Sequence, residues 1–392
     1  MQLEEIKQLD KKYISQSYGR SDVLLEEGKG CCVSGGGKSY LDMSSGIGVN
    51  CLGFCGEKWA DAVSAQAHKL QHTSNLFYTQ PCVLLAQKLC ERTGMNKAFF
   101  GNSGAEANEG AIKAARKYSF DKYNRTDRYN IISLQNSFHG RTIATLSATG
   151  QDVFHKNFFP FVEGFKFVEA GDFEALKNAA DDTVCAVIME LIQGEGGVIA
   201  QNQQYVDSVV KLCAEKDILL IIDEVQTGVG RTGKFLCCEH YGITPDIVTL
   251  AKGVGGGLPI GVVLLGDKVQ NTFTPGDHAS TFGGNPVVCA GANVVMDTLT
   301  DGFLSGVKAK SDKLRAGLMK LPHVTGVSGL GLMVGVEFDD KIAAKQVLAA
   351  AADKGLICLT AKTKLRLLPP LVITDEEIDK ALSILKSVLE VM

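Results

Sequence analysis

Short runs of apolar residues, many of them β-branched, recur through the middle of the chain, and each run ends in a polar or glycine-rich turn. Runs of this kind are typical of buried strands. The strands predicted in this way cover residues 97–100, 129–134, 186–191, 218–222, 247–250 and 261–266. Helix-forming stretches lie between them, at 59–70, 84–93, 103–116 and 204–215. Because strands and helices alternate, the pattern predicts an α/β domain with a mostly parallel central sheet flanked by helices.

The pattern changes at both ends of the chain. The first fifty residues hold polar and glycine-rich turns around short strands, which indicates an antiparallel outer segment. Near the C-terminus, half-exposed strands at 324–329 and 333–338 alternate with amphipathic helices, as in an α+β domain. We therefore divide the chain into three parts. They are an N-terminal segment 1–50 that packs with the small domain, a large domain 51–295 and a small domain 296–392.

Lys252 is the most informative residue, because it follows a predicted buried strand and precedes a run of glycines. An ammonium group in such an apolar wall is poorly solvated, so its pKa should fall, and a neutral amine condenses with carbonyl groups. Alone, such a lysine is usually a surface residue. Asp223, however, ends another buried strand. An amine and a carboxylate at neighbouring strand ends suggest pyridoxal phosphate, held as a Schiff base by the lysine while the aspartate keeps the ring nitrogen protonated.

A second turn suits the phosphate of such a cofactor. Ser103, with Glu106 three residues later, forms a capping box, so a helix should begin here. The backbone N–H groups of Gly104 and Ala105 would then point out of a helix N-terminus, which binds anions. Capping boxes occur on many helices that bind nothing, and the turn gains its meaning from the lysine and the aspartate in the same chain.

Four further side chains are candidates for the same crevice. Phe138 can stack on a flat cofactor, and Arg141 can bind a carboxylate in bidentate fashion, although alone they would be a core residue and a surface charge. Glu195 lies on a glycine turn beyond a strand, where open α/β sheets bind ligands. Arg366 lies among apolar neighbours, where a charge usually needs a partner.

Residues 228–233 match the G-x-G-x-x-G pattern of dinucleotide-binding proteins and follow a predicted strand. In those proteins a helix begins directly at the glycines. Here the segment continues into Lys234-Phe235-Leu236 and two cysteines without a clear helix. We therefore interpret 228–233 as a loop.

Composition narrows the class of protein. The 392 residues are 45% hydrophobic and 21% charged, as expected for a globular protein with a large core. The net charge of −4 gives no reason to expect nucleic acid or an anionic membrane as a partner. No apolar run approaches the ~20 residues of a membrane span, and the first residues lack the pattern of a secretory signal. We expect a cytoplasmic protein.

The 12 cysteines are scattered, without the paired spacing of zinc sites. We interpret them as free thiols in a reducing compartment and expect no metal. A structural metal is the minor alternative, at Cys51 and Cys55 or at Cys237, Cys238 and His240.

In combination and in order, these motifs resemble those of the class III, ornithine-type aminotransferases, which are pyridoxal phosphate enzymes of fold type I. The resemblance extends from 18–23 through 47–50 to 365–370. It departs at 52–58, where the family usually has a histidine-rich turn, and this departure leaves the exact acyl-ornithine substrate open.

The resemblance implies specific roles. Lys252 and Asp223 are the expected catalytic residues. Cofactor contacts are implied for Ser103, Gly104, Ala105, Phe138, Asp223, Glu224, Val225, Gln226, Lys252 and Thr281. Substrate contacts are implied for Arg141, Glu195, Ser280 and Arg366. Thr281 would reach the phosphate of the partner subunit, so the resemblance implies a homodimer with its active sites at the interface.

The implied reaction is a ping-pong transamination between N-acetylornithine and 2-oxoglutarate, which gives N-acetylglutamate semialdehyde and glutamate in arginine biosynthesis. Aminotransferases acting on ornithine, succinylornithine, N-succinyldiaminopimelate or 4-aminobutyrate share nearly all these residues and remain alternatives. A racemase or decarboxylase with the same fold is more remote and would not consume 2-oxoglutarate. A protein that only binds the cofactor is disfavoured, because every reacting group is present.

Overall fold

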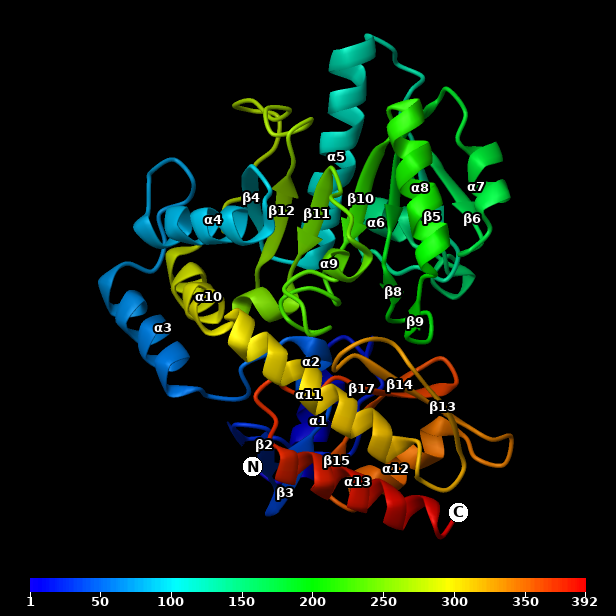
Figure 1. Ribbon diagram of the computed structural model, residues 1–392. Coiled ribbons are helices and arrows are strands. Elements are labelled where there is room, and N and C mark those ends of the chain that lie inside the picture. The colour runs from blue at the N-terminus through cyan, green and yellow to red at the C-terminus, as the bar shows by residue number, and fades with distance from the viewer.

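A seven-stranded sheet forms the centre of the molecule in the computed structural model, which describes residues 1–392 (Figure 1). In spatial order its strands are β4 (Lys97–Gly101), β12 (Gly261–Leu265), β11 (Ile247–Leu250), β10 (Leu219–Asp223), β7 (Val184–Met189), β5 (Asn130–Leu134) and β6 (Phe165–Val168). β12 runs antiparallel to both of its neighbours, and the other pairings are parallel. The expected α/β architecture with a mostly parallel sheet is confirmed.

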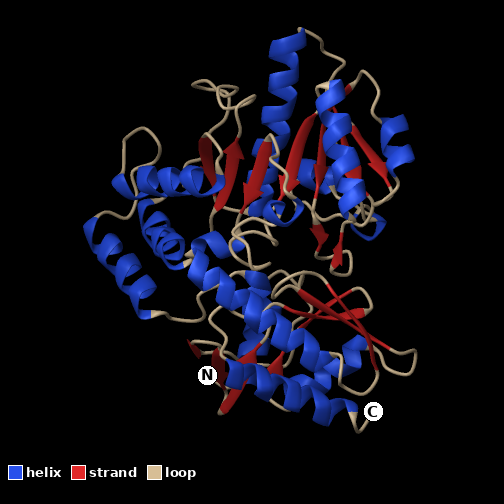
Figure 2. Cartoon of the chain, in the orientation of Figure 1, coloured by secondary structure: helices blue, strands red, loops and turns tan.

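Helices cover both faces of this sheet (Figure 2). One face carries α5 (Gly104–Tyr123) and α6 (Ile143–Ala148), and the other carries α7 (Phe173–Ala179) and α8 (Gln203–Lys216). The central strands are therefore buried on both sides and read as continuous apolar runs. α5 packs closely because its inner face is small: a Cβ atom at Gly110 would lie 2.8 Å from the Val263 side chain.

The carboxyl ends of β10 and β11 place the two expected catalytic residues at one edge of the sheet. The strands pair in parallel with Asp223 opposite Thr249, and Lys252 follows β11 after a single intervening residue. β4 leads into the N-terminus of α5 near the same edge. The site expected from the sequence therefore lies in the crevice at the strand ends.

The C-terminal part forms a smaller α+β unit below this edge (Figure 1). Its antiparallel sheet has the order β13 (Val324–Ser328), β14 (Val334–Phe338), β17 (Lys364–Leu367) and β16 (Leu359–Ala361). Its helices are α11 (Asp301–Leu318), α12 (Ala344–Asp353) and α13 (Asp375–Leu389). The smaller α+β part of the predicted fold class is confirmed.

The N-terminal segment joins this lower unit. β1 (Glu27–Lys29), β2 (Cys32–Gly35) and β3 (Lys38–Asp42) form an antiparallel meander. β3 then pairs in parallel with β15 (Leu356–Ile357) of the C-terminal part. This pairing supports the proposed association of residues 1–50 with the small domain, and the domain boundaries at 50 and 295 stay a prediction.

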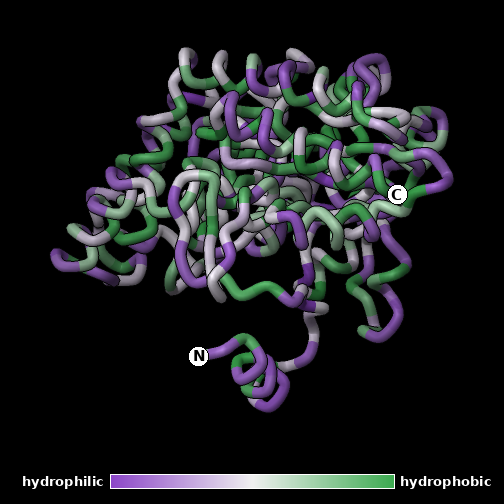
Figure 3. Tube along the Cα trace, turned by 90° about the horizontal axis from the view of Figure 1, so that it is seen from below, coloured by the Kyte–Doolittle hydropathy of each residue, from purple (hydrophilic) through white to green (hydrophobic).

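The chain begins with a helix that the sequence analysis did not predict. α1 (Leu3–Tyr13) has no buried residue and projects from the body of the molecule (Figure 3). Its acidic first turn and basic last turn favour a helix, because they complement the helix dipole.

The remaining elements connect these units. They are α2 (Ser45–Gly48), α3 (Glu57–Lys69), α4 (Gln80–Thr93), η1 (Asp152–Phe154), β8 (Ile192–Gln193), β9 (Ile199–Ala200), α9 (Cys238–Tyr241), η2 (Lys252–Gly255) and α10 (Pro286–Thr298). No single helix has the length and apolar composition to cross a membrane. The bent pair α10 and α11 meets these criteria only when the two helices are taken together.

Candidate active site

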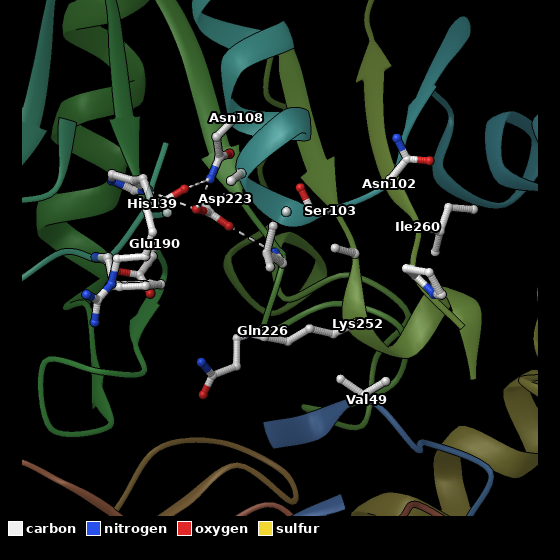
Figure 4. Close-up of a pocket in the computed structure, with 18 of the residues that line it drawn as sticks. Val49, Asn102, Ser103, Asn108, His139, Glu190, Asp223, Gln226, Lys252 and Ile260 are labelled. Atoms are coloured by element: carbon white, nitrogen blue, oxygen red, sulfur yellow. Dashed lines mark hydrogen bonds and ion pairs between the residues drawn. The ribbon is translucent and has the colours of Figure 1, made fainter. Parts of the chain in front are cut away.

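A cavity of about 490 Å³ opens at the carboxyl edge of the central sheet (Figure 4). Its volume lies within the usual range for small-molecule sites. It brings together most of the residues predicted from the sequence: Ser103, Gly104, Ala105, Phe138, Arg141, Asp223, Val225, Gln226 and Lys252. These residues come from turns far apart in the sequence, and the sheet edge is what makes them neighbours.

Lys252 lies half-buried in the wall of this cavity. Burial lowers the pKa of its amine, an effect that Asp223 and Glu195 partly offset, so the predicted fall is confirmed. Its backbone has a φ of +46°, which is uncommon for a residue with a Cβ atom. Strained backbone of this kind persists where the surrounding structure holds it, and it often marks functional sites.

Asp223 lies deep in the cavity, 3% exposed. Its Oδ2 accepts a hydrogen bond from the Asn108 side chain at 2.7 Å and lies 2.8 Å from Nδ1 of His139 (Figure 4). Its Oδ1 accepts the N–H of Val225 at 2.9 Å. These contacts fix the carboxylate, and Asn108 and His139 had not been identified from the sequence.

The predicted phosphate turn has the geometry of a helix N-terminus. Ser103 caps α5, and its Oγ accepts the N–H of Glu106 at 3.1 Å. The hydrogen bond from the N–H of Ala107 to the carbonyl of Ser103 is the first one of the helix. The N–H groups of Gly104 and Ala105 come before it and have no partner within the helix, so they are available for an anion. A side chain could not replace Gly104, because a Cβ atom there would lie 2.7 Å from Val225.

Phe138 and Arg141 lie together on the turn after β5. The Phe138 ring packs edge-on against Phe154, with centroids 5.8 Å apart. The guanidinium of Arg141 lies 4.0 Å from the Phe154 centroid and 5.5 Å from that of Phe138. Arg141 is exposed and has no carboxylate partner, so it is available for an anionic ligand.

Arg366 and Glu195 form an ion pair across the boundary between the two units. Arg366 Nη1 lies 2.5 Å from Glu195 Oε1, and it also donates to Gln226 Oε1 at 3.3 Å. Arg366 is almost completely buried, whereas the Glu195 side chain is 29% exposed. In the same turn Gly196 has no space for a side chain, because a Cβ atom there would lie 2.7 Å from the Asn136 carbonyl oxygen.

Glu190, at the end of β7, is a further cavity residue that sequence reasoning missed. Its carboxylate accepts the N–H of Phe138 at 3.0 Å and that of Gly194 at 3.4 Å. Burial raises the pKa of Glu190 to about 7, although His139 acts in the opposite direction. The only local signal was its place at a strand end.

Five predicted residues do not line the cavity: Glu195 and Arg366, which form the ion pair described above, and Ser280, Thr281 and Glu224. The Ser280 hydroxyl accepts hydrogen bonds from the Asn102 side chain and the N–H of Gly283, and Thr281 is exposed to solvent. The Glu224 side chain turns into the core, where it accepts hydrogen bonds from the Thr227 hydroxyl and the Cys238 N–H. We therefore leave Glu224 out of the proposed cofactor contacts.

The cavity has the features that pyridoxal phosphate requires. It combines an amine of lowered pKa, free N–H groups at a helix N-terminus and a fixed buried carboxylate. No group of three His, Cys, Asp or Glu side chains is arranged to hold a metal ion, which argues against the minor metal alternative. His240 instead contacts Thr232.

Comparisons with known proteins agree with this geometry. The family model of class-III aminotransferases matches residues 13–389. The acetylornithine aminotransferase of Haemophilus ducreyi is 55% identical over 394 residues, which cover 100% of both chains. That of Methanocaldococcus jannaschii is 46% identical, with 97% of this chain and 96% of the relative covered.

Solved structures give the same result. The ornithine aminotransferase of Toxoplasma gondii has a TM-score of 0.95 at 34% identity, with 100% of this chain and 96% of that chain covered. The N-acetylornithine aminotransferase of Stenotrophomonas maltophilia has a TM-score of 0.84 at 35% identity and 98% coverage of both chains. The predicted fold type I is thereby confirmed. The chain belongs to the class-III aminotransferases.

Proposed function

We propose that this enzyme transfers the amino group of N-acetylornithine to 2-oxoglutarate, with pyridoxal phosphate as its cofactor. The observation that carries the proposal is the unequal state of two arginines. Arg141 is unpaired, whereas Arg366 is neutralised by Glu195. Such a site suits two substrates of which one has a single carboxylate and the other has two. The names of the relatives support the choice of donor.

The cofactor would be held by residues already described. The N–H groups at Gly104 and Ala105 and the Ser103 turn would bind its phosphate, Phe138 would pack on its ring, and Asp223 would pair with the ring nitrogen. When bound, pyridoxal phosphate supplies an aldehyde that condenses with amines and a ring that accepts electrons. Asn108 and His139 keep the Asp223 carboxylate in place for this role.

Lys252 then acts as the base. The lowered pKa favours the neutral form of the amine. In this form Nζ can take the proton from the substrate carbon that carries the amino group, and it can then donate that proton again to complete the transfer. Arg141 orients the substrate by binding a carboxylate in bidentate fashion.

Glu195 and Arg366 are proposed to form a gate. While they are paired, the cationic arginine does not repel the amine of acetylornithine. When glutamate or 2-oxoglutarate enters, Glu195 moves away and Arg366 binds the second carboxylate. The partial exposure of the Glu195 side chain supports this movement.

The gate predicts opposite effects for two substitutions. Glu195→Ala should slow the acetylornithine half-reaction and preserve or improve the glutamate half-reaction. Arg366→Ala should weaken the use of 2-oxoglutarate more than that of acetylornithine. Single-turnover kinetics measure the two halves separately. Equal losses in both halves for both variants would rule out the gate and leave Glu195 as a turn residue.

We further propose a homodimer in which Thr281 of one subunit contacts the cofactor phosphate of the other. The exposure of Thr281 in one subunit supports this arrangement. Mixing inactive Lys252→Ala subunits with inactive Thr281→Arg subunits should restore part of the activity in hybrid dimers. The Thr281 variant must first be shown to silence its own homodimer. No recovery after verified subunit exchange would place Thr281 in its own site.

A panel of donors assayed with 2-oxoglutarate tests the substrate proposal. Acetylornithine should have the highest kcat/KM among acetylornithine, ornithine, succinylornithine, N-succinyldiaminopimelate and 4-aminobutyrate. A higher value for another donor would replace the substrate but keep the reaction. Product formation without consumption of 2-oxoglutarate would indicate a racemase or decarboxylase. The free cysteines fit the reducing cytoplasm that we propose as the location.

A further inference from the structure

The loop after β10 contains a buried cation that has no role in the site described above. Arg231, in the G-x-G-x-x-G segment, is 2% exposed. Its Nη1 donates to the carbonyls of Pro369 at 2.5 Å and Leu332 at 3.2 Å, and its Nη2 donates to the Ser45 hydroxyl at 3.4 Å. These acceptors belong to three segments of the chain outside the central sheet, so one side chain ties the large unit to all of them.

The charge of Arg231 is not neutralised by a direct partner. Asp42 acts on it from a distance, but the two groups form no ion pair, and burial lowers the pKa of the guanidinium to about 10. A buried charge without a close partner is costly, and apolar residues could fill the same space. Apolar residues could not provide the planar set of guanidinium N–H donors, which holds several carbonyl groups at fixed positions.

The carbonyls that Arg231 binds lie next to the strands that carry Arg366. Pro369 follows Arg366 by three residues, and Leu332 directly precedes the segment leading into β14. In the sheet, Arg366 lies opposite Gly335 of β14. The backbone carbonyl of Arg231 also accepts the N–H of Leu332 at 3.0 Å. Both strands are therefore fixed to this loop near the position of Arg366.

The same loop also contains the large-unit residue that Arg366 contacts. Gln226 lies five residues before Arg231, and its side chain accepts a hydrogen bond from Arg366. The loop thus follows Asp223 directly and contains both Gln226 and Arg231, which binds the backbone beside Arg366. One short segment sets the distance between the cofactor-facing carboxylate and the second arginine.

We propose that Arg231 is a positioning residue. It holds the backbone of Arg366 at the position from which the Arg366 guanidinium can bind the second carboxylate of glutamate and 2-oxoglutarate. The proposal rests on the gate function assigned to Arg366 above. Arg231 contacts no substrate itself and acts through the backbone of β14 and β17. Its loss should therefore weaken binding of dicarboxylates much more than binding of the single-carboxylate donor.

Binding of glutarate to the holoenzyme, measured by calorimetry, tests this proposal. Glutarate has both carboxylates of the acceptor and no group that can react. Arg231→Lys keeps the positive charge but loses the planar guanidinium donors, and it should weaken glutarate binding by about tenfold or more. The dissociation constant of acetylornithine, taken from its half-reaction, should change by less than about threefold.

Arg315→Lys is the matched control. Arg315 also binds carbonyls of this part of the small unit, at Ser328, Gly331 and Met333, but it lies on α11 and does not reach the large unit. Its replacement should lower the melting temperature of the protein but leave the dissociation constants of glutarate and acetylornithine nearly unchanged. If Arg231→Lys loses affinity for glutarate and for acetylornithine equally, or for neither, the proposal is overturned.

Two more variants make the result unambiguous. Ser45→Ala removes the hydroxyl that accepts from Arg231 and donates to the Leu368 carbonyl at 2.5 Å, so it should reduce glutarate affinity in the same selective way even if Arg231→Lys does not fold. An unchanged glutarate affinity in Ser45→Ala would then contradict the proposal. Arg366→Ala distinguishes a failure of the gate from a failure of the role of Arg231. If Arg366→Ala also keeps full affinity for glutarate, the gate function of Arg366 is wrong. If only Arg366→Ala loses affinity for glutarate, the gate stands and the positioning role of Arg231 is overturned.

Discussion

Lys252→Ala is expected to lower the rate of transamination by about a thousandfold or more, because the amine is both the attachment point for the cofactor and the base. Lys252 is the only lysine that lines the cavity, and its pKa is lowered, so no other amine there can take over these roles. Cofactor binding through the Ser103 turn should persist without a covalent bond. Turnover and bound cofactor are measured on the same preparation.

Lys216→Ala is a suitable control for this experiment. Lys216 binds the Ala180 carbonyl at 2.6 Å and lies just before β10, at the opposite edge of the sheet from the cavity. Its replacement should leave turnover close to that of the unmodified enzyme. Turnover of Lys252→Ala within about tenfold of the unmodified enzyme would contradict the assignment of Lys252 as the base.

Asp223→Ala should slow both half-reactions by about a thousandfold or more, because the resemblance assigns this carboxylate to the ring nitrogen, where it sustains electron acceptance. Lys252 should still bind the cofactor covalently in this variant. The hydrogen bonds from Asn108 and Val225 show how firmly the protein fixes the carboxylate. Single-turnover rates and the absorbance of the bound cofactor are the measurements.

Asp223→Asn distinguishes charge from packing. The amide oxygen can still accept one of the hydrogen bonds that the carboxylate accepts, but the negative charge is lost. If the charge is what matters, Asp223→Asn should be nearly as slow as Asp223→Ala. Rates within about tenfold of the unmodified enzyme for either variant would mean that Asp223 is only a structural cap.

The placement of Lys252 and Asp223 could be predicted because it depends on local signals. Each residue lies at or just after the end of a buried, largely apolar strand, and parallel strands deliver their carboxyl ends to the same edge of a sheet. The start of α5 was predictable for a similar reason, since Ser103 and Glu106 form a local capping pattern.

The partners of Asp223 could not be predicted in this way. Asn108 lies one turn into α5 and His139 lies on the turn after β5, and only the packing of α5 on the sheet brings them to the carboxylate. Glu224, by contrast, was predicted as a cofactor contact but does not line the cavity. It adjoins Asp223 in sequence, but successive residues at a strand end point in different directions, and its side chain lies in the core.

The loop structure of segment 228–233 was predicted correctly, but the contacts of Arg231 within it were not. The absence of a following helix identified it as a loop, and the structure agrees. The sequence contains no sign that Arg231 would bind backbone carbonyls more than one hundred residues away, at Leu332 and Pro369. Such contacts arise only when the two units are assembled.

Reduction of the holoenzyme with borohydride, followed by peptide mapping, tests the central claim most directly. Reduction fixes the cofactor to the lysine that holds it, so the labelled peptide identifies that lysine without reference to activity. We predict a single pyridoxyl label on Lys252, at the carboxyl edge of the sheet beside Asp223. A label on any other lysine, or no label at all in enzyme that contains the cofactor, would contradict the account.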